Sequence, residues 1–224
     1  MSRAIVADYK LLTAAGLLSV FGLAMVYSAG QTDTPTAVAN VYKSQAVWLL
    51  IGLGFAYAVA QSSVRFIEWM TVPLYALSIV LLALTLLGFG AGAGTAASTK
   101  SWLAIGGVRV GQPSEIAKIT VVLMLAKVLS ARRDTPRSLL DLWKPAIIVI
   151  IPWAIIMLQP DLGSGIVFIG IFFAMLYWSG VAWPLLILIA SPAVSLIFSF
   201  SVALWGAWFF ILLALVLWYR PYLI

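Results

Sequence analysis

The chain has 224 residues, of which 64% are hydrophobic and 9% are charged, and its formal net charge is +6. Soluble globular proteins have about 45–50% apolar and about 25% charged residues, so this apolar excess cannot be buried in one core and must face lipid. The absence of cysteine and histidine excludes disulfides, thiol chemistry and histidine-ligated metals, and the basic residues lie between apolar runs, which argues against nucleic acid as a partner.

The apolar residues fall into eight long runs, and each is expected to form a membrane-spanning helix, because about 20 apolar residues cross the hydrocarbon core. In chain order the runs are residues 11–29, 44–60, 70–90, 116–129, 145–158, 165–178, 183–200 and 202–219. The first run is longer than the apolar core of a signal peptide and lacks a clear cleavage site. The predicted fold class is therefore all-α, a polytopic integral membrane protein.

The positions of Lys and Arg predict the direction of these helices, because cytoplasmic loops are enriched in basic residues. With the N-terminus inside, the inner loops hold Arg3, Lys10, Arg65, Lys127, Arg132, Arg133, Arg137, Lys144 and Arg220. The outer loops hold only Lys43, Lys100, Arg109 and Lys118. Both termini are therefore predicted to lie in the cytoplasm. The basic segment 131–144 is expected to lie against anionic lipid headgroups. The preferred interpretation is that it fixes the membrane topology, and the alternative is a regulatory role.

A polar stretch precedes the fourth predicted helix, where residues 100–118 read KSWLAIGGVRVGQPSEIAK. Residues 102–110 mix aromatic, aliphatic and glycine residues, and we expect them to lie along the outer interface. Pro113 suits the first turn of a helix, and the helix dipole favours Glu115 in that turn. Lys118 is three residues later on the same face, so the simplest interpretation is an ion pair. An ionisable group this deep in a membrane helix usually faces a cavity or substrate path, however.

A second polar stretch, residues 159–165, joins the fifth and sixth predicted helices and reads QPDLGSG. Taken alone, it is a tight turn in which Asp161 or Ser164 caps the next helix. Asp161 lies at the same predicted membrane level as Glu115 and Lys118, however. We therefore expect these three side chains to converge on one polar cavity that opens to the outer side.

These two strings together resemble the shape, elongation, division and sporulation (SEDS) family of bacterial membrane proteins, and within it the rod-shape branch. The string at residues 100–118 and the QPDLG of residues 159–163 occur in the family's order and on the expected side of the membrane. The resemblance extends from Tyr9 to about Ser191. It implies a single SEDS-like membrane domain, residues 1–224, in the bacterial cytoplasmic membrane.

The resemblance implies a peptidoglycan glycosyltransferase, which polymerises the undecaprenyl-pyrophosphate-linked precursor lipid II and works with a class B penicillin-binding protein. For a carboxylate at this site two roles stay open: it deprotonates the attacking sugar hydroxyl, or it holds a divalent cation, Mg or Mn. The matching positions give Glu115 and Asp161 as supporting catalytic acids, whose division of labour stays open. The implied substrate-binding residues are Lys100, Trp102, Arg109, Gln112, Ser114, Lys118 and Gln159.

The sequence also departs from the family. Relatives have about ten helices, and their proposed catalytic Asp lies in a large extracellular loop after the helix that corresponds to residues 183–200. Nothing in this sequence matches that loop, because residues 202–219 form another apolar run. We therefore expect the chain to be an N-terminal portion of a longer protein, and expect that this portion alone does not polymerise lipid II.

Three functions remain open from the sequence. The first is the lipid II glycosyltransferase, or an N-terminal portion of one. The second is a lipid II flippase, which needs polar residues along a path through the membrane, whereas the inner halves of these helices have almost none. The third is a non-catalytic membrane scaffold that docks a helix of a class B penicillin-binding protein, and it gains weight if these 224 residues are the whole gene product.

Overall fold

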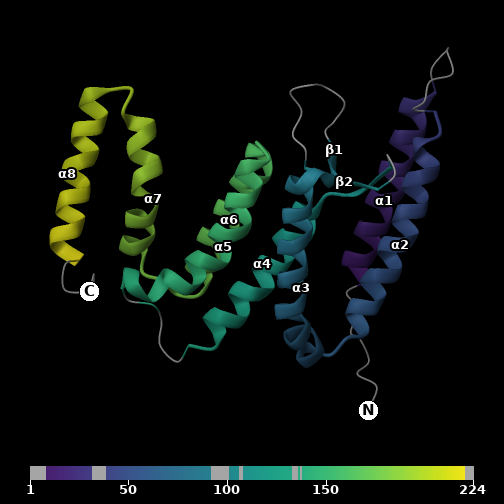
Figure 1. Ribbon diagram of the computed structural model, residues 1–224, viewed down its shortest axis with the longest axis horizontal. Coiled ribbons are helices and arrows are strands. Elements are labelled where there is room, and N and C mark those ends of the chain that lie inside the picture. The colour runs from purple at the N-terminus through teal and green to yellow at the C-terminus, as the bar shows by residue number, and fades with distance from the viewer. Residues whose placement is uncertain are drawn as a thin grey trace. The chain divides into compact units, whose positions relative to one another are not determined.

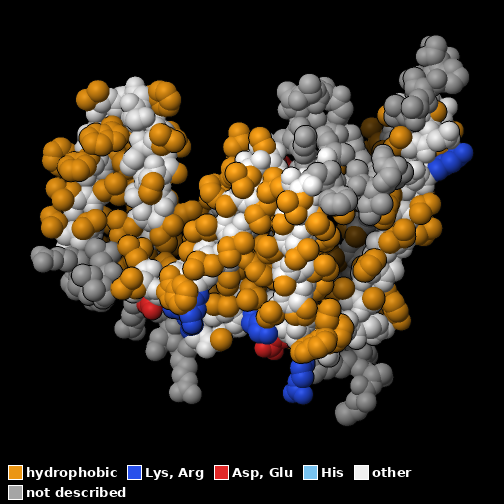
Figure 2. Space-filling model, viewed as in Figure 1, with side chains coloured by type: hydrophobic (Ala, Val, Ile, Leu, Met, Phe, Trp, Pro, Cys, Tyr) orange, Lys and Arg blue, Asp and Glu red, His pale blue; other side chains and the backbone are white. Residues whose placement is uncertain are grey.

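The computed structural model describes residues 9–31, 39–91, 101–105, 108–132, 136 and 138–219. Their contacts divide the chain into two compact units, Met1–Ile67 and Glu68–Ile224. Eight α-helices account for most of the described residues (Figure 1). Hydrophobic side chains cover these helices, and the charged side chains that can be seen lie near helix ends (Figure 2).

The first unit contains two helices, α1 (Tyr9–Gly30) and α2 (Val41–Gln61). They contact one another, and the rings of Tyr27 and Tyr42 meet edge to face with their centroids 5.1 Å apart. Gly30 is the only buried residue on α1, and α2 has none. Two apolar helices with so little buried surface are suited to lipid and not to water.

The second unit contains most of α3 (Val64–Leu84), which continues directly into the π-helix Thr85–Phe89. It also contains the five helices that follow, which are α4 (Pro113–Ser130), α5 (Trp143–Leu158), α6 (Leu162–Trp178), α7 (Trp183–Phe198) and α8 (Val202–Tyr219). The short 3-10 helix Leu139–Leu142 precedes α5.

The core of the second unit is built around α4, which packs against both α5 and α6. Its buried residues Val121 and Leu125 belong to one cluster with Leu82 of α3 and Phe168 of α6, and all four are 0% exposed. Buried hydroxyls join α3 to α4, since Ser78 Oγ lies 2.9 Å from Thr120 Oγ1. Small polar residues of this kind let membrane helices approach closely and hold them together.

A small antiparallel sheet leads into α4, with strands β1 (Gly90–Ala91), β2 (Trp102–Ile105) and β3 (Val108–Gly111) in that order. Ala91 pairs with Trp102, and Ile105 pairs with Val108. The register shifts between Leu103 and Ala104, as in a β-bulge. This sheet fixes the direction from which the chain enters α4.

The eight predicted runs all fall on helices of the structure, so the prediction of a mainly helical polytopic membrane protein is confirmed, whereas the number of membrane spans stays a prediction. Five of the described helices are long and apolar enough to cross a membrane, and α6 and α7 are shorter apolar helices. The helix α4 is long enough, but it carries the charged residues Glu115, Lys118 and Lys127. The orientation of the helices stays a prediction.

The sheet is the part of the fold that the sequence did not predict. Strands β2 and β3 pair antiparallel within residues 102–110, and residues 106–107 between them lie outside the described residues. The expected position of this segment along the outer interface stays a prediction.

The orientation can be tested by cysteine labelling, because the sequence has no native cysteine. Asn40, Gly163 and Ser130 are all exposed, and the positive charge bias places the first two outside and the third inside. Single cysteines at Asn40 and Gly163 should react with an impermeant thiol reagent in intact cells. A cysteine at Ser130 should react only after the membrane is permeabilised, and the reverse pattern would invert the topology.

Candidate functional site

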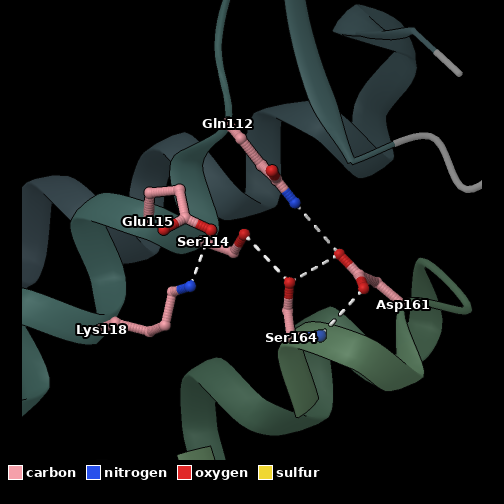
Figure 3. Close-up of polar contacts among 6 residues, drawn as sticks. All are labelled: Gln112, Ser114, Glu115, Lys118, Asp161 and Ser164. Carbon is pink, nitrogen blue, oxygen red and sulfur yellow. Dashed lines mark hydrogen bonds and ion pairs between the residues drawn. The ribbon is translucent and has the colours of Figure 1, made fainter. Parts of the chain in front are cut away.

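The start of α4 is arranged as the sequence predicted. Gln112 occupies the N-cap position, Pro113 is the first helical residue, and Glu115 lies in the first turn. The Gln112 backbone is extended because the preceding residues belong to β3. This geometry directs the Gln112 side chain away from the α4 axis and towards α6 (Figure 3).

The start of α6 is capped by Asp161, which confirms the local interpretation of this turn. Asp161 Oδ1 accepts a hydrogen bond from the Ser164 backbone N–H at 3.0 Å, and Asp161 Oδ2 accepts one from Ser164 Oγ at 2.8 Å. These bonds satisfy a donor that a helix start otherwise leaves free. They also hold the carboxylate in one orientation.

The two helix starts are joined by side chains (Figure 3). Gln112 Nε2 donates to Asp161 Oδ2 at 3.2 Å, and Ser114 Oγ lies 3.4 Å from Ser164 Oγ. Ser114 and Ser164 are buried, at 1% and 8% exposure, whereas Gln112 and Asp161 are partly exposed. These four residues are called the polar cluster below, and they present one carboxylate, one amide and two hydroxyls at the same end of α4 and α6.

Glu115 and Lys118 form the predicted ion pair, with Lys118 Nζ 2.7 Å from Glu115 Oε1. The Glu115 side chain is 59% exposed and that of Lys118 is 21% exposed. Both lie on α4 beside Ser114 (Figure 3). Among the described residues, no hydrogen bond or ion pair joins either of them to Asp161. The predicted convergence of Glu115, Lys118 and Asp161 is therefore only partial. Glu115 and Lys118 pair with each other, whereas Asp161 bonds to the neutral members of the polar cluster.

Gln159 lies just before this turn and is almost fully buried, at 2% exposure. Its Nε2 donates to Thr85 Oγ1 at 2.6 Å and to the Leu82 carbonyl oxygen at 3.2 Å. These acceptors lie where α3 changes to the π-helix, so Gln159 fixes the end of α5 against the end of α3. Its Oε1 has no partner among the described residues. A contact with substrate stays a prediction for Gln159.

The remaining predicted residues lie in or near the sheet. Trp102 is in β2 and is 36% exposed. The backbone of Arg109 lies in β3 opposite Ala104, but its side chain is outside the described part of the structure. Lys100 is also outside the described residues. The structure therefore leaves the roles of Lys100 and Arg109 untested.

Two residues of the site were not predicted from the sequence. Ser164 was expected only as a helix cap, but its hydroxyl contacts both Asp161 and Ser114. Thr85 was not expected at all, and it accepts the shorter of the two hydrogen bonds that the Gln159 amide donates. Ser164 follows Asp161 by three residues, so the local spacing was a usable signal. Thr85 is 74 residues from Gln159, and no local pattern could have paired them.

Replacing Gln159 with Met should lower the stability of the folded protein by about 1–2 kcal/mol, because two buried hydrogen bonds are lost. In a chain of this size that corresponds to a decrease of about 2–8 °C in the melting temperature. The measurement is thermal unfolding in detergent. Gln61→Met is the matched control, because the Gln61 amide makes an exposed bond to Tyr57. An equal decrease in both variants would contradict a structural role for the Gln159 amide.

The polar cluster gathers hydrogen-bonding groups at the end of an otherwise apolar helix bundle, and the binding of substrate there stays a prediction. Asp161 supplies a fixed negative charge, and the hydroxyls of Ser114 and Ser164 both donate and accept. Lys118 supplies a positive charge one turn away along α4. In the described part of the chain, no group of three acidic residues gathers as a metal site made of protein ligands alone.

Comparisons with known proteins found a matching family model and several similar proteins. A family model described as cell cycle protein, FtsW/RodA/SpoVE, matches residues 3–218. The chain is 30% identical over 198 residues to a protein of Mycobacterium tuberculosis named probable peptidoglycan glycosyltransferase FtsW, with 86% of this chain and 37% of that protein covered.

Two solved structures are also similar to this chain. One is the crystal structure of the rod shape determining protein RodA of Thermus thermophilus, with a TM-score of 0.69, 28% identity and coverage of 87% of this chain and 60% of that chain. The other is described as structural coordination of polymerization and crosslinking by a peptidoglycan synthase complex, with a TM-score of 0.72, 28% identity and coverage of 87% and 54%. The chain spans less than two thirds of the length of each of these three proteins.

Proposed function

The chain belongs to the FtsW/RodA/SpoVE family of cell cycle proteins, and we propose that the protein polymerises lipid II into the glycan strands of peptidoglycan. It is a multi-pass protein of the bacterial inner membrane. The observation that carries the proposal is the polar cluster, which gathers a carboxylate, an amide and two hydroxyls at one end of α4 and α6. In the predicted orientation this end faces the outer leaflet, where the lipid II headgroup lies.

Lipid II has an undecaprenyl tail in the membrane and a pyrophosphate at the headgroup level. The pyrophosphate is the leaving group, so its developing negative charge must be stabilised in the transition state. Lys118 is suited to this role, because its ammonium lies one turn from the start of α4 and is largely shielded from solvent. The apolar surface of the neighbouring helices provides the lipid environment that the polyprenyl tail requires.

Of the two candidate acids, Asp161 is the better placed to support sugar transfer. Its carboxylate is held by Ser164 and Gln112 in one orientation, and ordered positioning is a large part of catalysis. Glu115 is more exposed, and Lys118 compensates its charge. We propose that Asp161 positions the attacking sugar hydroxyl, or the cation beside it, through its negative charge.

A divalent cation fits this proposal, because Asp161 and the two serine hydroxyls are hard oxygen donors. Mg²⁺ is commonly bound by one or two carboxylates together with substrate phosphates, so a single protein carboxylate is sufficient. When bound, the cation would neutralise charge on the pyrophosphate. Asp161 would hold it on the protein side, and Ser114 and Ser164 would orient the carboxylate and its ligands.

A class B penicillin-binding protein is the proposed partner. One similar solved structure concerns a peptidoglycan synthase complex that couples polymerization and crosslinking. Newly made glycan strands need a transpeptidase to crosslink them, so the two activities would work in sequence. The exposed apolar faces of the helices offer surface for a partner's membrane helix.

The proposal is tested with the natural protein, purified with its cognate penicillin-binding protein and supplied with purified lipid II and Mg²⁺ or Mn²⁺. Glycan ladders on a gel that disappear on chelation are expected. A natural protein that binds lipid II but forms no glycan under any of these conditions would overturn the proposed activity. Movement of lipid II between the leaflets of vesicles, without polymerisation, would instead support a flippase.

A further inference from the structure

A second polar site lies at the opposite end of α4 from the polar cluster. A cavity of about 530 Å³ is bounded by the last turns of α4, the 3-10 helix Leu139–Leu142 and the first turn of α5. A helix of 18 residues is about 27 Å long, so this cavity is far from Asp161. Its volume falls in the range of about 300–1,000 Å³ that is usual for small-molecule sites.

The charged side chains of this cavity are mostly basic. Among the described lining residues they are Lys127, Arg132 and Lys144, with Asp141 as the acid, so these described side chains carry a net charge of +2. Arg132 is already engaged, because its Nη1 lies 3.5 Å from Asp141 Oδ1 and its other terminal nitrogen donates to the Asp141 carbonyl oxygen. This pair holds the short helix against the end of α4.

The two lysines keep their charge available. Lys127 Nζ donates to the Glu68 carbonyl oxygen at 3.1 Å, which is a neutral acceptor and uses one of its three donors. Lys144 Nζ lies 5.4 Å from the ring centre of Trp143. Neither ammonium has an acidic partner among the described residues. The cavity therefore presents two uncompensated positive charges to a ligand.

The rest of the cavity wall is apolar and includes Met124, Val128, Leu140 and Trp143. Leu140 and Trp143 are also exposed on the surrounding surface, at 68% and 56%. Free phosphate would make no favourable contact with these apolar side chains. A phospholipid would place its phosphate on the lysines and its glycerol and first methylene groups on the apolar side chains. Tryptophan and lysine are also the residues that anchor helices at the headgroup level.

We propose that this cavity binds the headgroup of an anionic phospholipid of the inner leaflet, with Lys127 and Lys144 as its phosphate ligands. Basic pockets between membrane helices on the cytoplasmic side are suited to such lipids. The bound lipid would bridge α4 and α5 at one end, while the polar cluster joins α4 and α6 at the other. This site is independent of the polymerisation chemistry.

The test is native mass spectrometry of the detergent-purified protein with equal amounts of phosphatidylglycerol and phosphatidylcholine. Phosphatidylglycerol should be retained about ten-fold more, because each nearby lysine adds to its attraction. The variant Lys127→Gln/Lys144→Gln should reduce that preference about ten-fold. The variant Lys127→Arg/Lys144→Arg, which keeps both charges, should preserve it and shows that the site still folds.

A matched control removes two positive charges elsewhere on the predicted inner side. Lys10→Gln/Arg65→Gln should leave the retention of phosphatidylglycerol unchanged, since neither residue lines the cavity. An equal loss in this control would mean that net charge alone decides binding, and would overturn the proposal. Full displacement of the lipid by inorganic phosphate or by an acidic peptide would overturn it too, because the apolar wall would then contribute nothing.

Discussion

Replacing Asp161 with Asn is expected to lower lipid II polymerisation by the natural protein about 100-fold, with little loss of folded protein. Asn is as good an N-cap as Asp, so its side-chain oxygen can keep the hydrogen bond from the Ser164 backbone N–H. The new amide replaces the oxygen that accepts from Gln112, and the Gln112 amide can turn to present its own oxygen. The change therefore removes the negative charge and keeps the local structure.

This substitution separates the two roles that Asp161 can have. If Asp161 serves only to cap α6, polymerisation by Asp161→Asn should stay within about three-fold of the natural protein, because the cap is preserved. Asp161→Ala gives the comparison, since it also removes the cap and should reduce stability by about 1 kcal/mol. Glu68→Gln is the matched control for loss of one carboxylate, because Glu68 is exposed and lies outside the polar cluster. Rates are read from glycan ladders at equal amounts of folded protein.

The parts of the fold that could be predicted are those governed by local pattern. Each α-helix coincides with an apolar run, and for five of the described helices length and composition alone indicate a membrane span. The start of α4 was predicted because Pro113 and Glu115 are helix-start signals within four residues of each other. The cap at Asp161 was predicted for the same reason, since its partner Ser164 is only three residues away.

The rest depends on contacts between distant residues, which a single sequence does not encode in a readable way. Gln112 and Asp161 are 49 residues apart, and Ser78 and Thr120 are 42 apart. The apolar pattern of a membrane helix is nearly uniform around its axis, so it does not tell which face meets a neighbour. The sheet was missed because its strands are at most four residues long and include glycine, which weakens the strand signal.

Replacing Lys118 with Met is expected to lower kcat/KM for lipid II about 100-fold, which is the cost of removing one group that stabilises charge in a transition state. Met keeps the apolar stem that Lys118 packs along α4, so helix stability should change little. The Glu115–Lys118 pair spans one turn of a helix and its acid is largely exposed. Such pairs contribute about 0.3–0.5 kcal/mol, too little to explain a 100-fold loss through folding.

The double variant Glu115→Gln/Lys118→Met decides what the pair does, because a double-mutant cycle isolates the interaction between two residues. If the pair only stabilises the start of α4, Lys118→Met and the double variant should both keep activity within about three-fold of the natural protein, because such a pair contributes so little to stability. If Lys118 acts on the pyrophosphate, Glu115→Gln alone should change the rate by no more than about three-fold, since it frees the ammonium for the substrate. The double variant should then stay as impaired as Lys118→Met, because no side chain is left to replace the lost positive charge. Activity within about three-fold of the natural protein in both Lys118→Met and the double variant would show that Lys118 has only a structural role, and that other residues stabilise the leaving group.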